Sequence, residues 1–114
     1  MEILVVDDSR KRQGILCGML EKKGTSISCC SSSNDFISVV DESAPDRIVL
    51  DLDTWRKGKG IYNYFGFAGR LSGIPIVFFN APENFSTLQG REPHEQDRIL
   101  RHPTEVKDLV SVIE

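Results

Sequence analysis

The sequence predicts a single α/β domain built on a doubly wound, five-stranded parallel sheet. Unbroken apolar runs recur along the chain, and such runs are typical of strands that are buried on both faces of a parallel sheet. Segments with helical periodicity separate these runs, and an alternation of strands and helices implies right-handed crossovers. The length of 114 residues leaves room for only one such domain.

Five segments are predicted strands. The strongly apolar ones are each followed directly by a polar residue, and they are 3–6, 47–50 and 75–79. Segment 26–29 is half polar, which suits the edge of a sheet, and segment 98–100 is a short candidate for the fifth strand. We therefore expect the strand order 2-1-3-4-5, in which the second strand lies at one edge.

Helical spacing of apolar residues fills most of the gaps. The predicted helices are one from the cap Ser9 to Gly24, one from 33 or 34 to Ala44-Pro45, one over 61–71, and a last one with Pro103 in its first turn. The stretch 81–97 contains Pro82, Gly90 and Pro93, so any fourth helix there is short or irregular. The last helical pattern has no stop signal, so residues 1–114 form either a complete domain or a fragment of a longer protein.

Composition excludes several classes of function. A total of 14 Lys and Arg against 17 Asp and Glu gives a net charge of −3, without the basic excess that nucleic-acid binding requires. No apolar run approaches the ~18 residues of a membrane span. Cys17, Cys29 and Cys30 lack the spacing of a zinc site and are odd in number, which argues against a disulfide framework. We expect a cytoplasmic protein that contacts neither nucleic acid nor membrane.

Acidic residues follow two strands that the predicted order makes neighbours. Asp7 and Asp8 end the first strand, and Asp51 ends the third. Ligands of such sheets bind where the strand order reverses, outside the carboxyl ends of these strands. A single Asp after a strand is usually a cap or turn residue, but three carboxylates at one point repel one another unless a cation relieves them. Oxygen ligands of this kind favour a hard cation, and Mg²⁺ fits best.

These residues carry a resemblance to a known family. The run over 3–9, with Asp7 and Asp8, and the later strand end at Asp51 resemble the CheY-like receiver domain of two-component response regulators, and the resemblance covers the whole chain. It implies a flavodoxin-like strand order and a phosphorelay in which Asp51 accepts a phosphoryl group from a histidine kinase or phosphotransfer protein. It also implies Mg²⁺ held at these three acids, with the backbone carbonyl of Asp53 as a further ligand.

The family's properties also bear on enzymatic activity and partners. A receiver accelerates phosphoryl transfer to itself but turns over no substrate, so we expect a phosphoprotein in signal transduction rather than an enzyme. Its signal is expected to pass to an output domain or to a downstream protein.

Three positions depart from the family pattern. Asn80 stands where the family has a Thr or Ser that hydrogen-bonds the phosphoryl group, and His102 stands where it has a Lys followed by Pro. The resemblance implies that Asn80 and His102 contact the phosphoryl group in place of those residues. Ile99 replaces an aromatic ring that turns inward in the family. Two interpretations therefore remain: an atypical phosphoacceptor with an altered readout, which we favour, or a pseudo-receiver that acts as a phosphorylation-independent protein-interaction module.

Other motifs have competing interpretations. Segment 51–54 resembles the Asp-x-Asp start of haloacid-dehalogenase-type phosphatases, but Trp55 stands where that family has its Thr, and too little chain follows. Trp55 is expected to pack in the core rather than to mark a partner surface. The basic run 10–12 is either a solvated face or a set of charges beside Asp7 that attracts a phosphoryl donor. Segment 57–60 lacks phosphate-loop spacing and is expected to be a solvated loop that adds positive charge near the site.

Overall fold

The structure, a computed structural model, describes residues 1–21, 24–32, 35–57, 71, 73–88 and 91–113. Its elements in chain order are β1 (Glu2–Val6), α1 (Arg10–Glu21), β2 (Ser26–Cys30), α2 (Phe36–Ser43), β3 (Arg47–Asp51), α3 (Leu52–Lys57), β4 (Ile76–Ala81), β5 (Arg98–Arg101) and α5 (Val106–Ile113). None of the described helices has the length and apolar character that crossing a membrane requires.

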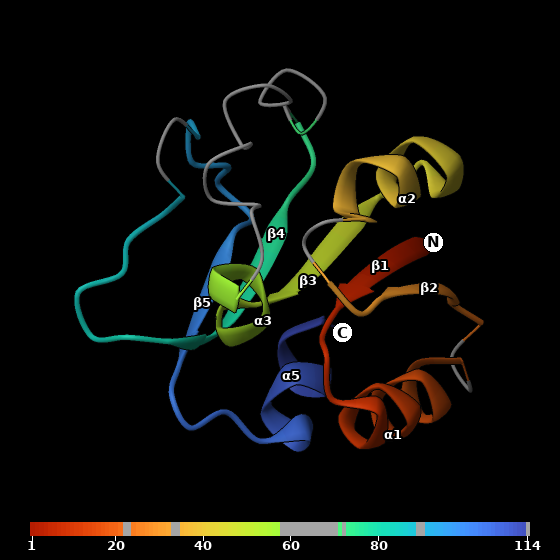
Figure 1. The fold of residues 1–114 in the computed structure, drawn as a ribbon, viewed down its shortest axis with the longest axis horizontal. Coiled ribbons are helices and arrows are strands. Elements are labelled where there is room, and N and C mark those ends of the chain that lie inside the picture. The colour runs from red at the N-terminus through yellow and green to blue at the C-terminus, as the bar shows by residue number, and fades with distance from the viewer. Residues whose placement is uncertain (22–23, 33–34, 58–70, 72, 89–90, 114) are drawn as a thin grey trace.

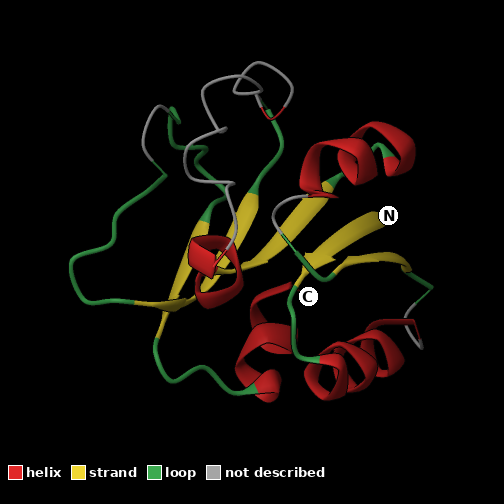
Figure 2. Ribbon diagram, in the orientation of Figure 1, coloured by secondary structure: helices red, strands yellow, loops and turns green. Residues whose placement is uncertain are grey.

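The strands form one parallel sheet in the order β2-β1-β3-β4-β5, which confirms the predicted fold class. Helices α1 and α5 cover one face of the sheet, while α2 and α3 lie on the other (Figures 1 and 2). Successive side chains of a strand point to opposite faces. In β1, Leu4 and Val6 therefore enter the core beneath α2 and α3, whereas Ile3 and Val5 enter the core beneath α1 and α5. This double burial explains the unbroken apolar runs.

Helix α1 begins as predicted, and only a narrow stripe of its apolar residues is buried. The Ser9 hydroxyl accepts a hydrogen bond from the Arg12 backbone N–H at 3.2 Å, as expected of an N-cap. Leu16 is buried against the sheet, but its apolar neighbour Ile15 is 45% exposed. A step of one residue turns the side chain by about 100° around the helix, which carries Ile15 towards solvent.

The other helix predictions have mixed outcomes. Helix α2 ends at Ala44, whose φ of 45° places it in the left-handed region, as the Ala44-Pro45 signal predicted. The prediction that Pro103 lies in the first turn of the last helix is wrong, because α5 begins only at Val106. The backbone before α5 is instead occupied by contacts with β4, made through Thr104.

The connections between β3, β4 and β5 agree only in part with the predictions. The predicted helix over 61–71 lies outside the described residues except for Leu71, which is buried in the core. The sequence did not predict α3, a short helix that begins directly after Asp51. Where the structure describes the 82–97 stretch it contains no helix, which agrees with the predicted loss of a regular fourth helix.

Candidate functional site

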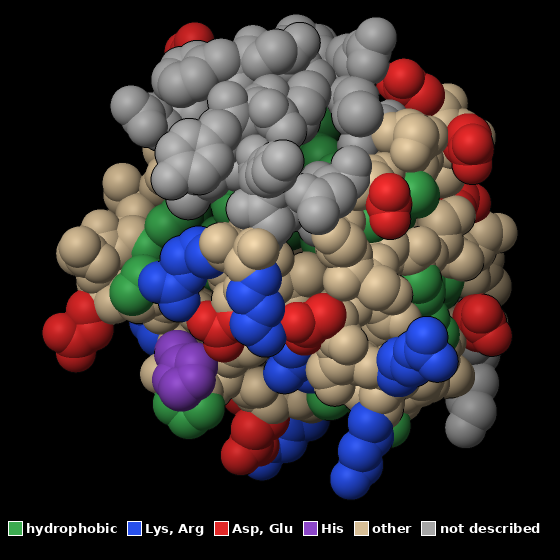
Figure 3. All heavy atoms as spheres, viewed as in Figure 1, with side chains coloured by type: hydrophobic (Ala, Val, Ile, Leu, Met, Phe, Trp, Pro, Cys, Tyr) green, Lys and Arg blue, Asp and Glu red, His purple; other side chains and the backbone are tan. Residues whose placement is uncertain are grey.

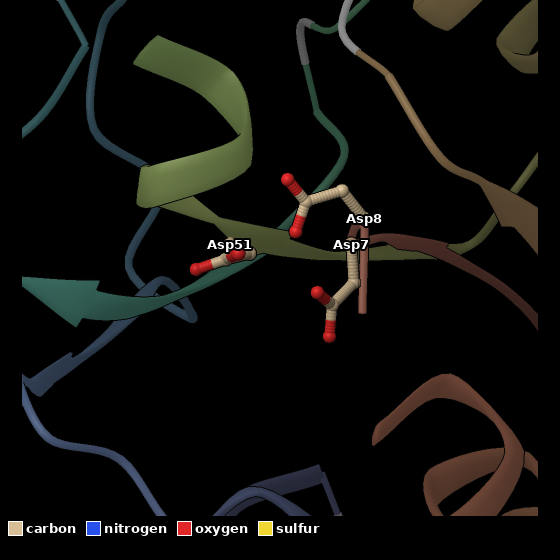
Figure 4. Close-up of side chains that lie close together, drawn as sticks. All are labelled: Asp7, Asp8 and Asp51. Carbon is tan, nitrogen blue, oxygen red and sulfur yellow. The ribbon is translucent and has the colours of Figure 1, made fainter. Parts of the chain in front are cut away.

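The three carboxylates that the strand order predicted to converge lie together at the carboxyl ends of β1 and β3. One oxygen from each of Asp7, Asp8 and Asp51 lies within 4.8 Å of the others. Figure 4 shows the three side chains gathered beside the start of α3. Asp7 and Asp51 are 0% and 1% exposed, whereas the Asp8 side chain is 38% exposed. Buried carboxylates need a counter-charge, so the neighbouring cations decide what this site can do.

Arg12 of α1 provides that charge for the two buried acids. Its Nε and Nη2 donate to the two carboxylate oxygens of Asp7 at 2.5 and 2.7 Å, and Nη2 also lies 3.1 Å from Oδ2 of Asp51. The guanidinium lies over the ring of Phe79, 5.2 Å from its centroid. The pKa of Arg12 is raised above its ordinary value, chiefly by the hydrogen bond to Asp7. Of the basic run 10–12, only Arg12 makes these contacts, and Arg10 and Lys11 are exposed.

Lys57 at the end of α3 pairs with the third acid. Its Nζ lies 2.9 Å from Oδ2 of Asp8, and this hydrogen bond is the main reason that the pKa of Asp8 is lowered. Both side chains are solvated, at 69% and 38% exposure, so the pair is weak. In the space-filling view, acidic and basic side chains lie side by side where α3 meets the surface (Figure 3). Lys57 bears the positive charge predicted near the site, and the rest of segment 57–60 lies outside the described residues.

Thr54 joins Asp51 to the β1 end of the site. Its hydroxyl donates to Oδ2 of Asp51 at 2.7 Å and accepts a hydrogen bond from the backbone N–H of Asp8 at 2.9 Å. Thr54 is 2% exposed; its hydrogen bond to Asp51 is buried, and the one from the Asp8 N–H is partly buried. The sequence analysis did not assign Thr54 a role. Its position could have indicated this role, because Thr54 follows the strand-end residue Asp51 by three residues. In the first turn of a helix, residues three apart lie on the same side, so the hydroxyl can reach the carboxylate.

Asn80 contacts Asp51 from the neighbouring strand β4. Its Nδ2 donates to Oδ1 of Asp51 at 3.0 Å, while its Oδ1 accepts a hydrogen bond from the Thr104 N–H at 3.0 Å. Asn80 has φ of 55°, a left-handed conformation that Asn adopts more readily than β-branched residues do. The amide is therefore held between the acceptor carboxylate and the segment that precedes α5.

The side chains of the remaining predicted site residues do not join this cluster, although the Asp53 backbone N–H donates to Oδ1 of Asp51 at 3.3 Å. His102 is exposed, and its side chain makes no hydrogen bond or ion pair with any residue that the structure describes. The Asp53 carboxylate turns to Arg56, with an N–O distance of 2.9 Å. The roles expected for the His102 imidazole and the Asp53 backbone carbonyl stay predictions.

Two apolar positions near the site belong to the core. Ile99 packs against the core on the α2 and α3 side, and it pairs with Phe78 across β4 and β5. Trp55 is 0% exposed, and its ring packs edge-on against Phe36 at a centroid distance of 5.2 Å. The packing interpretation of Trp55 is therefore confirmed, and the partner-surface interpretation is wrong.

Solved structures of response regulators share this architecture. A two-component response regulator from Clostridium difficile superposes with a TM-score of 0.75 at 24% identity, over 99% of this chain and 92% of that chain. The chemotaxis response regulator CheY4 of Vibrio cholerae gives a TM-score of 0.74 at 16% identity, over 98% and 94% of the two chains. The chain has the fold of a response regulator receiver domain. No family model matches it.

A third receiver-fold neighbour bears on the ligand chemistry. A response regulator protein from Burkholderia pseudomallei, whose structure holds a phosphorylated aspartic acid, a calcium ion and citrate, gives a TM-score of 0.73 at 17% identity, over 99% of this chain and 66% of that chain. In the present receiver fold, the three carboxylates offer only oxygen ligands at one point. This donor set fits a hard divalent cation.

Proposed function

We propose that the chain is a receiver domain of a two-component phosphorelay in which Asp51 accepts a phosphoryl group. One observation carries the proposal: the buried Asp51 carboxylate lies within 4.8 Å of the Asp7 and Asp8 oxygens, at the strand ends where this fold places ligands. The donor is a histidine kinase or a phosphotransfer protein. An Asp51 oxygen bonds to phosphorus as the donor's P–N bond breaks, and the released imidazole takes up a proton.

The residues around Asp51 have distinct parts in this reaction. Asp7, Asp8 and Asp51 would hold Mg²⁺, which when bound neutralises charge on the transferring phosphoryl oxygens. Thr54 and Asn80 hold the Asp51 carboxylate by hydrogen bonds to different oxygens and so orient the attacking group. After transfer, the Asn80 amide N–H is available to a phosphoryl oxygen, because it already lies 3.0 Å from Oδ1 of Asp51.

The test is a measurement of intact mass after incubation with acetyl phosphate and Mg²⁺. We expect the wild-type chain to gain the mass of one phosphoryl group, and we expect Asp51→Asn to gain none. Peptide mapping should place the group on Asp51. An unmodified wild-type chain at saturating donor and Mg²⁺, or equal incorporation in the variant, would contradict the proposal.

A specific observation favours a second candidate, a pseudo-receiver that binds protein partners without phosphorylation. Arg12 and Lys57 already form ion pairs with the three carboxylates, so the cluster has counter-charges of its own. An absence of both phosphorylation and chemical-shift response to beryllofluoride with Mg²⁺ would support this candidate. In either case we propose a cytoplasmic signalling module that passes its state to an output domain or downstream protein, and not an enzyme with its own substrate.

A further inference from the structure

Arg12 occupies the oxygens that a cation would need. Its guanidinium contacts both oxygens of Asp7 and Oδ2 of Asp51. A divalent cation that binds these acids directly must take at least one of those oxygens from Arg12. We propose that Arg12 is a built-in counter-ion that competes with the divalent cation for Asp7 and Asp51. This inference rests on the proposed function, because it assumes a cation at the same acids.

The contacts of Arg12 make it displaceable. Among the described residues, its side chain hydrogen-bonds only to the carboxylates of Asp7 and Asp51, and no backbone carbonyl holds it. Its side chain is 24% exposed, so the guanidinium is already next to solvent. An arginine can keep much of its stem on an apolar surface, here the Phe79 ring, while its charged end moves into water.

The third acid gives an incoming cation a first point of contact. Asp8 makes no hydrogen bond or ion pair with Arg12, and its only ion pair among the described residues is with the exposed Lys57. Because exposed pairs of this kind exchange readily with water and ions, a cation meets little competition there. The cation competes with Arg12 only for Asp7 and Asp51. These two carboxylates are buried and cannot be left without a counter-charge.

Two consequences follow for the cation-free and cation-bound protein. Without the cation, Arg12 compensates the buried carboxylates, so the domain does not depend on metal to fold. With the cation, the displacement of Arg12 lowers the apparent affinity, since the competent arrangement is only a fraction of the population. Removal of the Arg12 charge should therefore tighten cation binding and, in the absence of the cation, weaken the fold.

The experiment titrates MgCl₂ into the wild-type chain and two matched variants by isothermal titration calorimetry at constant ionic strength. Arg12→Gln removes the competing guanidinium. Arg10→Gln removes the same charge from the same helical turn at an exposed position without a contact to the acids. We expect Arg12→Gln to bind Mg²⁺ at least about tenfold more tightly than the wild type and Arg10→Gln to stay within about twofold.

Stability provides a second readout. Urea denaturation should show that Arg12→Gln is less stable than the wild type without Mg²⁺, with a smaller difference at saturating Mg²⁺. Equal Mg²⁺ affinity in Arg12→Gln and the wild type overturns the inference, as does an equal gain in Arg10→Gln. An Arg12→Gln chain that stays unfolded in saturating Mg²⁺ also overturns it, because a cation that replaces Arg12 must restore the fold.

The two proposals fail differently. Phosphorylation of Asp51 by acetyl phosphate together with unchanged Mg²⁺ affinity in Arg12→Gln leaves the receiver function standing and removes the competition. Tighter Mg²⁺ binding in Arg12→Gln with no phosphorylation of any variant keeps the competition and removes the phosphoacceptor. An Arg12→Lys variant keeps the charge but loses the bidentate hydrogen bond to Asp7. Its Mg²⁺ affinity should lie between those of the wild type and Arg12→Gln.

Discussion

Two arginine–aspartate pairs in this domain look alike but have different surroundings. Arg12 contacts Asp7 and Asp51 at the mouth of the acid cluster and is 24% exposed. Arg91 contacts Asp97 in the connection between β4 and β5, and their side chains are 3% and 10% exposed.

The two arginines also differ in what else they hydrogen-bond. Besides Asp97, Arg91 donates to the backbone carbonyls of Leu71 and Ile74. Asp97 in turn accepts hydrogen bonds from the backbone N–H groups of Ile76 and His94. The pair thus holds the connection between β4 and β5 against the start of β4. Among the described residues, the Arg12 side chain hydrogen-bonds only to carboxylates, which a metal ion can also bind. Arg91 is instead held also by the Leu71 and Ile74 carbonyls, so we expect Arg91 to be structural and Arg12 to be exchangeable.

The largest effect is expected for Arg91→Leu. It leaves the Asp97 carboxylate and two backbone carbonyls without their donor, so the free energy of unfolding should fall by about 3–5 kcal/mol. Urea denaturation measures this loss, and Mg²⁺ should not restore it. Arg98→Gln, at the exposed start of β5, is the control: it loses only solvent-exposed hydrogen bonds to the Glu95 and Asp97 carbonyls and should change stability by no more than about 0.5 kcal/mol. If Mg²⁺ restored the stability of Arg91→Leu, the proposed difference between a structural Arg91 and an exchangeable Arg12 would be wrong.

Thr54→Val should have the next largest effect. The hydroxyl lies between Asp51 and the Asp8 backbone, so its loss removes a buried hydrogen bond to Asp51 and the partner of the Asp8 N–H, and it should cost about 1–3 kcal/mol. Thr87→Val is a matched control, because the Thr87 hydroxyl oxygen is buried and has no hydrogen-bond partner among the described residues. That substitution should be neutral or slightly stabilising in the same urea assay. A larger loss for Thr87→Val than for Thr54→Val would contradict the assigned hydrogen bonds.

Acid should weaken the Arg91–Asp97 pair. Burial alone would raise the pKa of Asp97, but hydrogen bonds from Arg91, Ile76 and His94 outweigh it and hold the pKa below the ordinary value of 3.8. A carboxylate with a lowered folded pKa contributes stability that is fully present above its unfolded pKa and is lost as pH falls through the folded one.

Urea midpoints between about pH 5 and pH 2 measure this loss. Asp97→Asn should be less stable near neutral pH and should lose less stability over that interval than the wild type. The lowered pKa of Asp8, caused chiefly by Lys57, should add a smaller decline in the same direction. Parallel curves for the wild type and Asp97→Asn would show that Asp97 does not carry the acid dependence.

The smallest effect is expected for Lys57→Gln. Its partner Asp8 is solvated, so loss of this exposed pair should leave Tm unchanged within about 1 °C. Magnesium binding should tighten by less than about twofold, in the same direction as for Arg12→Gln but more weakly. A gain in Mg²⁺ affinity as large as that of Arg12→Gln would mean that Lys57 and Arg12 compete equally with the metal ion.

The convergence of Asp7, Asp8 and Asp51 could be predicted because it depends on strand order. Apolar runs that are buried on both faces indicate a parallel sheet, and the carboxyl ends of parallel strands meet at one edge. Asn80 is placed beside Asp51 by the same reasoning, because it ends the next strand. These inferences need no knowledge of side-chain rotamers.

The contacts made by helix residues could not be predicted in the same way. Arg12 and Arg10 lie in one basic run, and only the rotation of α1 against the sheet places one at the acids and the other in solvent. Thr54 reaches Asp51 because α3 begins directly after β3, without an intervening loop. No strong helix cap or helix breaker in the sequence predicted this start.

The sequence by itself determined the layered architecture and the meeting point of the acids, since both follow from the periodicity of apolar residues and the direction of the strands. Only the tertiary structure decided which cations neutralise those acids. The reason is that an ion pair between distant segments depends on helix rotation and side-chain reach at the level of single ångströms, and a linear pattern does not encode either one directly.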